Sequence, residues 1–358
     1  MNPAPTTRRT LALGVGLTNA CNLSCAHCYR SPGIDALRPG DLLRAIGALP
    51  VRSVNFGTGE NALHPEFPLL IEELARRSLR LTMTTNGYSA QALDDDHLRQ
   101  FAEVEFSIDY PAPHAHDAAR SPGNWALIAE QMARCSELGI RANVVAVMMS
   151  TNVALLPDIA ALAGARGALL RVNAFQAVTT DAFALTYEQF WQGYRGLLAA
   201  ADLVTCGEPV VRAVLGIAPT PGAGCGSETV RITPRGAVVA CVYQRDADLR
   251  LADLARHGCE LLDTKAFRRN DVVPRACQAC PQLATCGGGC ASRRALAGNL
   301  GEPDPYCPLV AGRVPPDLNA AKVLAGETLA KAASACTSVF RWRPAAARCG
   351  ERGDGARG

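Results

Sequence analysis

Three cysteines near the start of the chain have the spacing of an iron–sulfur ligand loop. Cys21, Cys25 and Cys28 stand in the sequence Cys-Asn-Leu-Ser-Cys-Ala-His-Cys-Tyr. Three thiolates can hold three irons of a [4Fe–4S] cluster and leave the fourth iron open to another molecule. The alternatives are a zinc knuckle or a chance group of buried thiols, but a structural zinc usually has four ligands and shows Cys-x2-Cys pairs. We therefore interpret the loop as a cluster site with one open iron.

With an aromatic residue, Tyr29, after its last cysteine, this loop resembles that of the radical S-adenosylmethionine (radical SAM) enzymes. The resemblance implies that the open iron chelates the amino and carboxylate groups of SAM. It also implies that an electron from the cluster splits SAM into methionine and a 5′-deoxyadenosyl radical. His27, inside the loop, is interpreted as a solvent-side spacer and not as a ligand.

A second motif, Phe56-Gly-Thr-Gly-Glu-Asn61, resembles the Gly-Gly-Glu-Pro motif of the same family. In that family the backbone and carboxylate of the motif bind the SAM ammonium, which assigns Thr58, Gly59 and Glu60 to the SAM site. Thr58 stands at the first Gly position and Asn61 at the Pro position. Because glycine permits close approach of the backbone to a ligand, Thr58 predicts an altered contact, while Glu60 predicts that the contact is kept.

Polar residues also follow the next two predicted strands. Asn86 ends the third strand, Ser107 and Asp109 end the fourth, and Arg120 follows a few residues later. In related enzymes Ser and Asp here face the ribose and the methionine end of SAM, so the resemblance implies that these residues contact SAM. Turn chemistry is the alternative for Asn86 and Asp109, since both residue types are common in turns.

A second group of cysteines lies in the C-terminal third of the chain, and its spacing matches the auxiliary-cluster SPASM domain found in part of the radical SAM family. The resemblance implies one cluster held by Cys225, Cys241 and Cys290, and another held by Cys277, Cys280, Cys286 and Cys307. With the SAM cluster, three [4Fe–4S] clusters are expected. Structural zinc is the alternative, because a Cys-x2-Cys pair with two further cysteines can also bind that ion.

The first auxiliary site has no evident fourth ligand in the sequence. Either Cys206 supplies it, or the site is open and binds substrate directly. Some relatives that oxidise their substrates carry a catalytic Asp directly after the second auxiliary cysteine, and here that residue is Val242. Tyr243 and Asp246 are therefore the candidates for a catalytic base.

Residues 10–215 alternate between short apolar runs and amphipathic stretches. The predicted strands are Leu11–Leu17, Ser53–Phe56, Leu79–Thr84, Val104–Ile108, Asn143–Met148 and Leu169–Phe175, and helices such as Phe67–Arg77 and Asn124–Leu138 lie between them. Strands that alternate with helices form parallel βαβ units. Six units predict an α/β fold with an open, partial (β/α)6 barrel like the TIM barrel, which the family resemblance also implies. Sites in such folds gather at the carboxyl ends of the strands, where the cysteine loop lies.

The predicted domains are a radical SAM core over residues 1–216, a small Cys-rich SPASM domain over 217–310 and a C-terminal helix over 311–340. A tail over 341–358, rich in Arg, Gly and Ala, is predicted to be disordered. The boundary after residue 216 rests on the stretch Ile217–Gly226, whose prolines and glycines are typical of a linker.

The 358-residue chain is 48% hydrophobic and has a formal net charge of +3. These values indicate a globular protein without a nucleic-acid partner. Thr6–Leu17 mimics a short twin-arginine export signal, but Leu11–Leu17 also fits a first core strand, which we prefer because cleavage after Ala20 would leave Cys21 without a strand to hold it. With no apolar run of about 20 residues, we expect a cytoplasmic protein with no membrane partner and with metal-binding cysteines.

The expected activity is that of a radical SAM oxidoreductase or lyase, with an electron donor such as flavodoxin or ferredoxin. Auxiliary clusters suit the removal of an electron from a substrate radical. Only about twenty residues precede Cys21, which leaves no room for a leader-binding domain. We therefore expect a small polar metabolite as substrate, namely a sugar, cyclitol or nucleoside intermediate of natural-product or antibiotic biosynthesis, with oxidation, decarboxylation or epimerisation as the outcome.

Two other classes of function are open. One is maturation of a ribosomal peptide or protein by side-chain oxidation or cross-linking. The other is a non-catalytic iron–sulfur scaffold or electron carrier, against which Glu60 and the three-cysteine loop both speak.

Overall fold

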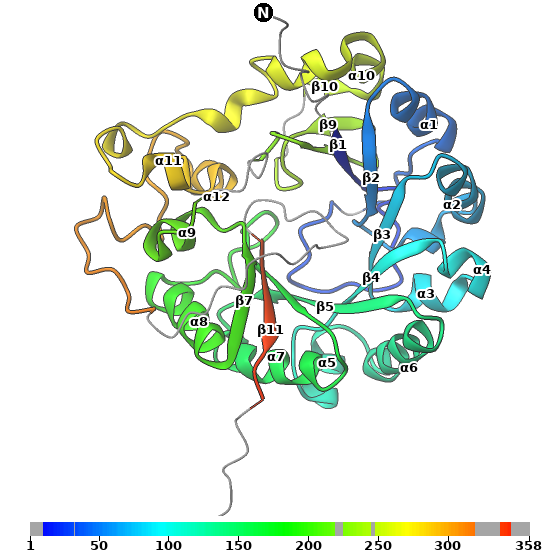
Figure 1. Cartoon of the computed structure of the whole chain (residues 1–358), viewed down its shortest axis with the longest axis horizontal. Helices are drawn as coiled ribbons and strands as arrows, with labels where there is room; N and C mark the ends of the chain where they lie inside the picture. The colour runs from blue at the N-terminus through cyan, green and yellow to red at the C-terminus, as the bar shows by residue number, and fades with distance from the viewer. Residues whose placement is uncertain (1–9, 32, 219–224, 245–247, 319–336, 345–358) are drawn as a thin grey trace, which may run out of the picture.

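The computed structural model of the chain describes residues 10–31, 33–218, 225–244, 248–318 and 337–344. Its centre is an open barrel wall of six parallel strands in sequence order (Figure 1): β1 Leu11–Val15, β2 Val51–Phe56, β3 Arg80–Thr85, β4 Phe101–Ser107, β5 Arg141–Met148 and β6 Leu170–Ala174. The predicted α/β fold with a partial barrel is confirmed.

Helices between the strands pack on the outer face of this wall, as Figure 1 shows for α1, α2 and α6. Their bounds are α1 Pro39–Gly47, α2 Phe67–Arg76, α3 Tyr88–Ala92, α4 Asp95–Leu98, α5 Pro113–Ala119, α6 Asn124–Glu137 and α7 Leu156–Gly164, with 3₁₀ turns at Asn61–Leu63 and Val153–Leu155. In α2 the buried side chains are Phe67, Leu70, Ile71 and Leu74, which recur at the spacing of one helix face. Burial of this apolar face holds the helix on the sheet.

The inner face of the wall carries polar side chains that pair with one another. Val104 and Phe106 of β4 belong to the apolar core, whereas Glu105 between them contacts the guanidinium of Arg171 on β6 and accepts from the Thr84 hydroxyl at 3.0 Å. A charge buried without a partner would be costly, so the pairing of Glu105 with Arg171 is what permits a polar barrel interior.

Strands from the C-terminal half extend the same sheet. After α8 Tyr187–Ala200, β7 Ala201–Cys206 and α9 Pro209–Leu215, the chain returns as β8 Thr229–Ile232, β9 Ala237–Val239 and β10 Leu249–Arg250. β8 pairs in parallel with β1, and β9 and β10 continue as antiparallel neighbours. The sheet therefore runs without a break across the boundary that the sequence predicts after residue 216.

The last described strand, β11 Thr337–Trp342, corrects the prediction for the C-terminus. It lies antiparallel between β6 and β7, so residues predicted as the end of a helix and the start of a disordered tail belong to the sheet. Its sequence, Thr-Ser-Val-Phe-Arg-Trp, is rich in β-branched and aromatic residues, which favour strands. Residues 319–336 and 345–358, most of the predicted helix and tail, lie outside the described part of the chain.

The cysteine-rich segment consists of short elements packed beside the barrel. They are α10 Leu251–His257, α11 Leu283–Cys286 and α12 Ala291–Leu296, with 3₁₀ turns at Gly258–Asp263, Arg268–Asp271 and Arg275–Cys277. In the described residues, no helix has both the length and the apolar character needed to cross a membrane.

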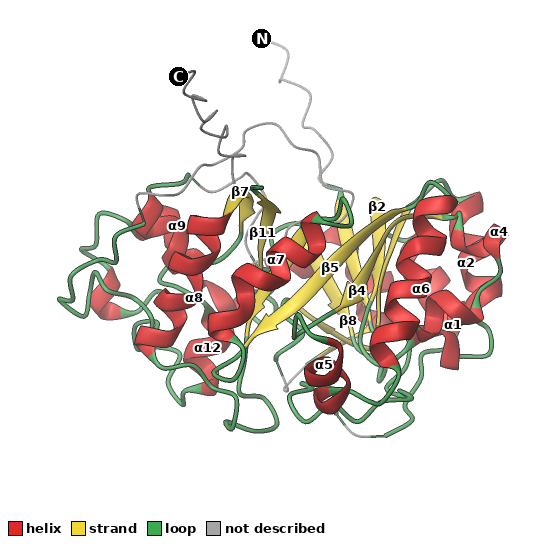
Figure 2. Cartoon of the chain, turned by 90° about the horizontal axis from the view of Figure 1, so that it is seen from below, coloured by secondary structure: helices red, strands yellow, loops and turns green. Residues whose placement is uncertain are grey.

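Figure 2 shows the barrel from the side, with the arrowhead of β5 directed to the edge where α5 lies. Because β1–β6 are parallel, the loops that follow β1, β2, β3 and β4 meet at this carboxyl edge. It is the edge at which the sequence places its SAM-site residues.

Candidate functional site

The loop with Cys21, Cys25 and Cys28 follows β1 and lies within the ring of strands (Figure 1). The guanidinium of Arg30 donates to the carbonyl oxygens of Asn19 at 2.9 Å and Leu23 at 3.1 Å, which fixes the curve of the loop. All three thiols are half-buried. Burial raises the pKa of Cys21 and of Cys25, and Cys28 lies close enough to raise both further. The predicted triad is therefore gathered in one place.

The donor set of this loop fits a [4Fe–4S] cluster. Such a cluster takes one thiolate on each of several irons. Three half-buried thiols on one short loop match that requirement.

Glu60 is buried with 1% of its surface exposed, and both of its carboxylate oxygens accept hydrogen bonds from the β3–α3 loop. One oxygen accepts from the Thr85 hydroxyl and from the Ser89 N–H at 2.8 Å, and the other accepts from the Asn86 N–H at 3.0 Å. Burial raises the pKa of Glu60 above its usual value, although these donors oppose the shift. The carboxylate thus holds together the loops after β2 and β3.

Gly59 brings the motif after β2 against the cysteine loop. Its φ is +66°, and a Cβ at this position would lie 2.2 Å from the carbonyl oxygen of Thr18 and 2.6 Å from that of Ala20. Only glycine fits so close to another backbone. In the next residue, the Glu60 N–H donates to the same Ala20 oxygen at 2.8 Å. The backbone of Gly59 therefore lies directly against the backbone that leads into the cysteine loop.

Thr58 adopts a conformation that its residue type disfavours. Its φ is +77°, and in the described part of the chain only Ser78 is another non-glycine residue with a positive φ. For a β-branched residue this conformation costs about 1–3 kcal/mol. The Thr58 hydroxyl is hydrogen-bonded at 2.8 Å to the hydroxyl of Tyr29, the residue after Cys28. The side chain of Thr58 therefore binds the cysteine loop, and its altered contact with SAM stays a prediction.

Asn86 makes a turn contact and also reaches the cysteine loop. Its side-chain oxygen accepts from the Tyr88 N–H at 3.0 Å, which is turn chemistry. Its side-chain nitrogen donates to the Asn22 side chain at 2.9 Å and lies 3.8 Å from the Cys21 sulfur. Ser107 ends β4 at the same edge and is half-buried.

Asp109 is fully buried and binds three neighbours. Arg120 donates to one carboxylate oxygen at 3.0 and 2.6 Å, His27 lies 3.3 Å from that oxygen, and the Val147 N–H donates to the other at 2.9 Å. Burial alone would raise the pKa of Asp109, but Arg120 and His27 outweigh it and hold this pKa well below its usual range. Both Asp109 and Arg120 act on the pKa of the Cys25 thiol.

The interpretation of His27 as a solvent-side spacer is wrong. Its side chain is only 8% exposed, because it lies against Asp109 and meets the ring of Phe183 edge-on at 6.0 Å. The Thr179 hydroxyl on the same β6–α8 loop donates to the Cys28 carbonyl oxygen at 3.0 Å. No motif marks Thr179 or Phe183, since their contacts come from elements more than 150 residues away in the sequence.

The auxiliary cysteines lie near one another, Cys225 beside Cys241 and Cys290, and Cys277 beside Cys280, Cys286 and Cys307. The thiols of Cys225 and Cys241 are hydrogen-bonded to each other, and this bond, burial and the proximity of Cys290 raise the pKa of Cys225. In the second set, burial and then Cys307, Cys286 and Cys280 raise the pKa of the Cys277 thiol to about 11.

Cys206 lies on β7 and contacts other partners. Its thiol is 3.4 Å from the Ser338 hydroxyl and 3.7 Å from the Glu208 carbonyl oxygen. Burial raises its pKa to about 11, and the groups that contribute most after burial are Ser338, Glu208 and Arg212. Nothing in this geometry brings Cys206 to the Cys225–Cys241 pair.

A buried charge network beside Cys290 carried no signal in the sequence. The guanidinium of Arg293 binds the carboxylates of Glu208 at 2.7 Å and Asp304 at 2.6 Å, and Asp304 also accepts from the Cys290 N–H at 2.7 Å. Arg293 lies 4.8 Å from the ring centre of Tyr306. The network joins the end of β7 to the segment that carries the auxiliary cysteines.

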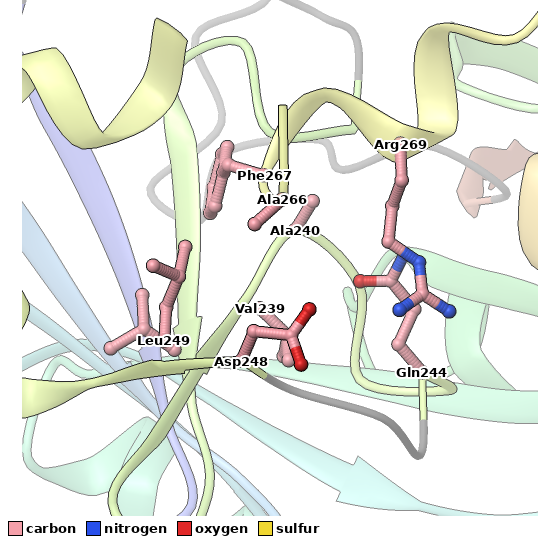
Figure 3. Close-up of a pocket in the computed structure, with 9 residues that line it drawn as sticks. Val239, Ala240, Gln244, Asp248, Leu249, Ala266, Phe267 and Arg269 are labelled. Carbon is pink, nitrogen blue, oxygen red and sulfur yellow. The ribbon is translucent and has the colours of Figure 1, made fainter. Parts of the chain in front are cut away.

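Of the two candidate catalytic residues, Tyr243 is half-buried, and its ring meets the Tyr29 ring edge-on at 5.2 Å. Asp246 lies outside the described residues. Figure 3 shows a pocket near this segment, lined by Val238, Val239, Ala240, Gln244, Asp248, Leu249, Ala266, Phe267 and Arg269. None of these lining residues is a predicted site residue.

Residues 15–157 match the Radical SAM superfamily model, and these residues carry the cysteine loop, the motif after β2 and Asp109 with Arg120. The chain therefore contains a radical SAM domain and is a radical SAM enzyme, with a C-terminal cysteine-rich region consistent with a SPASM domain. The resemblance inferred from the cysteine loop is therefore confirmed, and it implies a [4Fe–4S] cluster and SAM.

Among its relatives, the chain is 28% identical over 318 residues to the mycofactocin maturase MftC of Mycolicibacterium smegmatis, covering 81% of each chain. Its fold is similar to Streptococcus suis SuiB bound to precursor peptide SuiA, with a TM-score of 0.61 and 15% identity over 82% of this chain and 75% of that one. It is also similar to anSMEcpe with bound AdoMet and Cp18Cys peptide, with a TM-score of 0.62 and 16% identity over 83% and 94%. At these identities the two solved structures show the fold alone.

These comparisons contradict the expectation of a small polar metabolite as substrate and partner. The relative that matches over most of both chains is named a maturase, and two structural neighbours hold peptides. The error came from reading substrate class from the few residues before Cys21. The barrel and the cysteine-rich segment, which make up most of the match, are the better guide.

Proposed function

We propose that the protein is a radical SAM maturase that abstracts a hydrogen atom from a residue of a ribosomal peptide or protein, leading to side-chain oxidation or cross-linking. The observation that carries this proposal is the match to a named maturase over 318 residues, which spans 81% of both chains. Its length exceeds that of the matched radical SAM segment, residues 15–157. The likeness therefore extends beyond the part that all radical SAM enzymes share.

In this proposal Cys21, Cys25 and Cys28 hold the SAM cluster, which when bound supplies the electron that splits SAM into methionine and a 5′-deoxyadenosyl radical. The gathering of the three half-buried thiols supports this assignment. Two further [4Fe–4S] clusters, for about twelve irons in all, would be held by Cys225, Cys241 and Cys290 and by Cys277, Cys280, Cys286 and Cys307. The proximity of thiols within each set supports this assignment.

The SAM site proposed here is formed by the loops after β2, β3 and β4. Thr58, Gly59 and Glu60 would place the motif backbone near the SAM ammonium, and Asn86, Ser107, Asp109 and Arg120 would line the rest. Support comes from the bonds that join these loops to one another and to the cysteine loop. The buried Asp109–Arg120 pair keeps one guanidinium and one carboxylate in fixed positions beside Cys25.

The roles of Tyr243 and Asp246 as a catalytic base stay predictions, and the ring of Tyr243 lies against the cysteine loop. A base would take the proton released when a substrate radical loses its electron to an auxiliary cluster. That electron would leave through a donor–acceptor protein such as flavodoxin or ferredoxin.

The experiment that tests the proposal uses the reconstituted holoenzyme, SAM, a reductant and synthetic peptides encoded by short reading frames beside the gene. We expect one peptide to raise 5′-deoxyadenosine formation above the peptide-free rate and to lose hydrogen, seen as a lower mass. The matched control is the variant with Cys21, Cys25 and Cys28 all replaced by Ala, which should give neither product. If no such peptide raises the rate, the maturase proposal is wrong.

A further inference from the structure

Tyr29 connects three parts of the molecule that each carry site residues. It follows Cys28 directly, its hydroxyl is 2.8 Å from the Thr58 hydroxyl, and its ring meets that of Tyr243 at 5.2 Å and 77°. Thr58 belongs to the motif after β2, and Tyr243 stands two residues after Cys241. One half-buried side chain therefore touches the cysteine loop, the motif loop and the auxiliary segment.

The chemical surroundings of Tyr29 agree with this central position. Its hydroxyl is buried, and the thiols of Cys28 and Cys241 both lie near it. Arg231 of β8 is also near, and its guanidinium lies over Gly14 of β1, where a Cβ would be 1.9 Å away. Tyr29 thus lies where the first strand of the barrel and the auxiliary segment meet.

The conformation of Thr58 indicates that its hydroxyl has a use. A glycine would adopt a φ of +77° without strain, whereas threonine, branched at Cβ, does not. What threonine adds at this position is the hydroxyl that binds Tyr29. A strained residue persists when the surrounding structure fixes it, and such residues cluster at functional sites.

We propose that Thr58, Tyr29 and Tyr243 form a positioning bridge that sets the SAM motif loop relative to the auxiliary segment. The bridge rests on the proposed function in one respect: in a maturase it would couple SAM cleavage to modification of the peptide. Tyr29 and Thr58 act here through the loops they hold, so they are positioning residues.

The test uses SAM alone as the probe and measures its dissociation constant for the reconstituted holoenzyme. Tyr29→Phe and Thr58→Val each remove one hydroxyl, and each should weaken SAM binding about tenfold. The double variant should have a SAM dissociation constant no higher than that of the single variant that binds SAM less tightly, because both changes break the same bond. Thr58→Ser keeps the hydroxyl and should restore binding. The control is Thr151→Val, which breaks an exposed Tyr–Thr hydroxyl pair of the same length, 2.8 Å, and should leave SAM binding unchanged.

The far end of the bridge is tested with Tyr243. Tyr243→Leu removes the ring that meets Tyr29 and should weaken SAM binding although Tyr243 lies in the auxiliary segment. A second readout, the urea midpoint of the reconstituted holoenzyme without SAM, should show the same non-additivity for Tyr29→Phe with Thr58→Val. Wild-type SAM affinity in Tyr29→Phe and Thr58→Val, or in Tyr243→Leu, would overturn the bridge. Because neither measurement uses a peptide, both still test the bridge if the maturase proposal fails.

Discussion

The carboxylate of Glu60 accepts a hydrogen bond from the backbone N–H of Asn86 at 3.0 Å, and it also binds the N–H of Ser89 at 2.8 Å. These bonds tie the loop after β2 to the loop after β3. The side chain of Asn86 in turn reaches Asn22 of the cysteine loop at 2.9 Å. The cysteine loop and the loops after β2 and β3 are therefore connected through Glu60 and Asn86.

We expect Glu60→Gln to weaken SAM binding and to destabilise the protein while leaving the SAM cluster in place. The Glu60 carboxylate accepts hydrogen bonds from three donors, whereas the amide of Gln would turn its NH₂ group, itself a donor, toward at least one of them. Loss of hydrogen bonds to a charged group costs about 1.5–3 kcal/mol. SAM titration and urea unfolding measure the two effects. Glu72→Gln, at an exposed carboxylate on α2, is the control and should change neither. An unchanged SAM dissociation constant in Glu60→Gln would show that the motif is misplaced.

The pKa of Asp109 predicts how stability depends on pH. This pKa is lowered in the folded state, so the stabilisation is present above the unfolded value of about 3.9 and is lost as pH falls below it. Asp109→Asn removes this contribution and leaves Arg120 buried without its carboxylate, which should cost about 3–5 kcal/mol near neutral pH. The difference in unfolding free energy between the wild type and Asp109→Asn should shrink from about pH 5 down to pH 2. A difference that stays constant with pH contradicts the assignment.

Replacing Cys21, Cys25 and Cys28 together with Ala should remove one of three clusters, about four of about twelve irons. It should abolish SAM cleavage and leave the auxiliary clusters in place. Iron and sulfide analysis, with electron paramagnetic resonance of the reduced protein, provides the measurement. Cys135→Ala is the control, because Cys135 is a buried residue of α6 that belongs to none of the three predicted cysteine sets. One cluster in the intact protein would rule out the three-cluster account.

The auxiliary clusters should be needed for product but not for slow, unproductive SAM cleavage. Cys277→Ala with Cys280→Ala removes two of four gathered thiols, and we expect loss of peptide modification with 5′-deoxyadenosine formation retained at the peptide-free rate. Both products are quantified in the same reaction by mass spectrometry. Full peptide modification by this double variant is the outcome that the proposal does not allow.

The sequence was sufficient for the barrel and for the gathering of the cysteines, because both follow from local patterns. Alternating strands and helices dictate the parallel wall, and the spacing of Cys21, Cys25 and Cys28 lies within one loop. β11 could not be foreseen, since it inserts between β6 and β7 through pairs such as Thr337 with Asn173, far apart in the chain. The contacts of His27 with Asp109 and of Tyr29 with Tyr243 were missed for the same reason.

Substrate class could not be derived from the residues at all. The polar barrel interior, with Glu105 and Arg171, is compatible with many ligands, and the length before Cys21 proved a poor guide.

Transfer of deuterium from a peptide to 5′-deoxyadenosine tests the central claim most directly. The peptide found to stimulate the holoenzyme is synthesised with deuterium on the side chain that changes, and 5′-deoxyadenosine is isolated after reduction with SAM present. We predict that the 5′-deoxyadenosine formed with modified peptide carries one deuterium from that side chain. If modified peptide forms while the 5′-deoxyadenosine carries no deuterium, whichever side-chain position of the peptide is labelled, the account is contradicted.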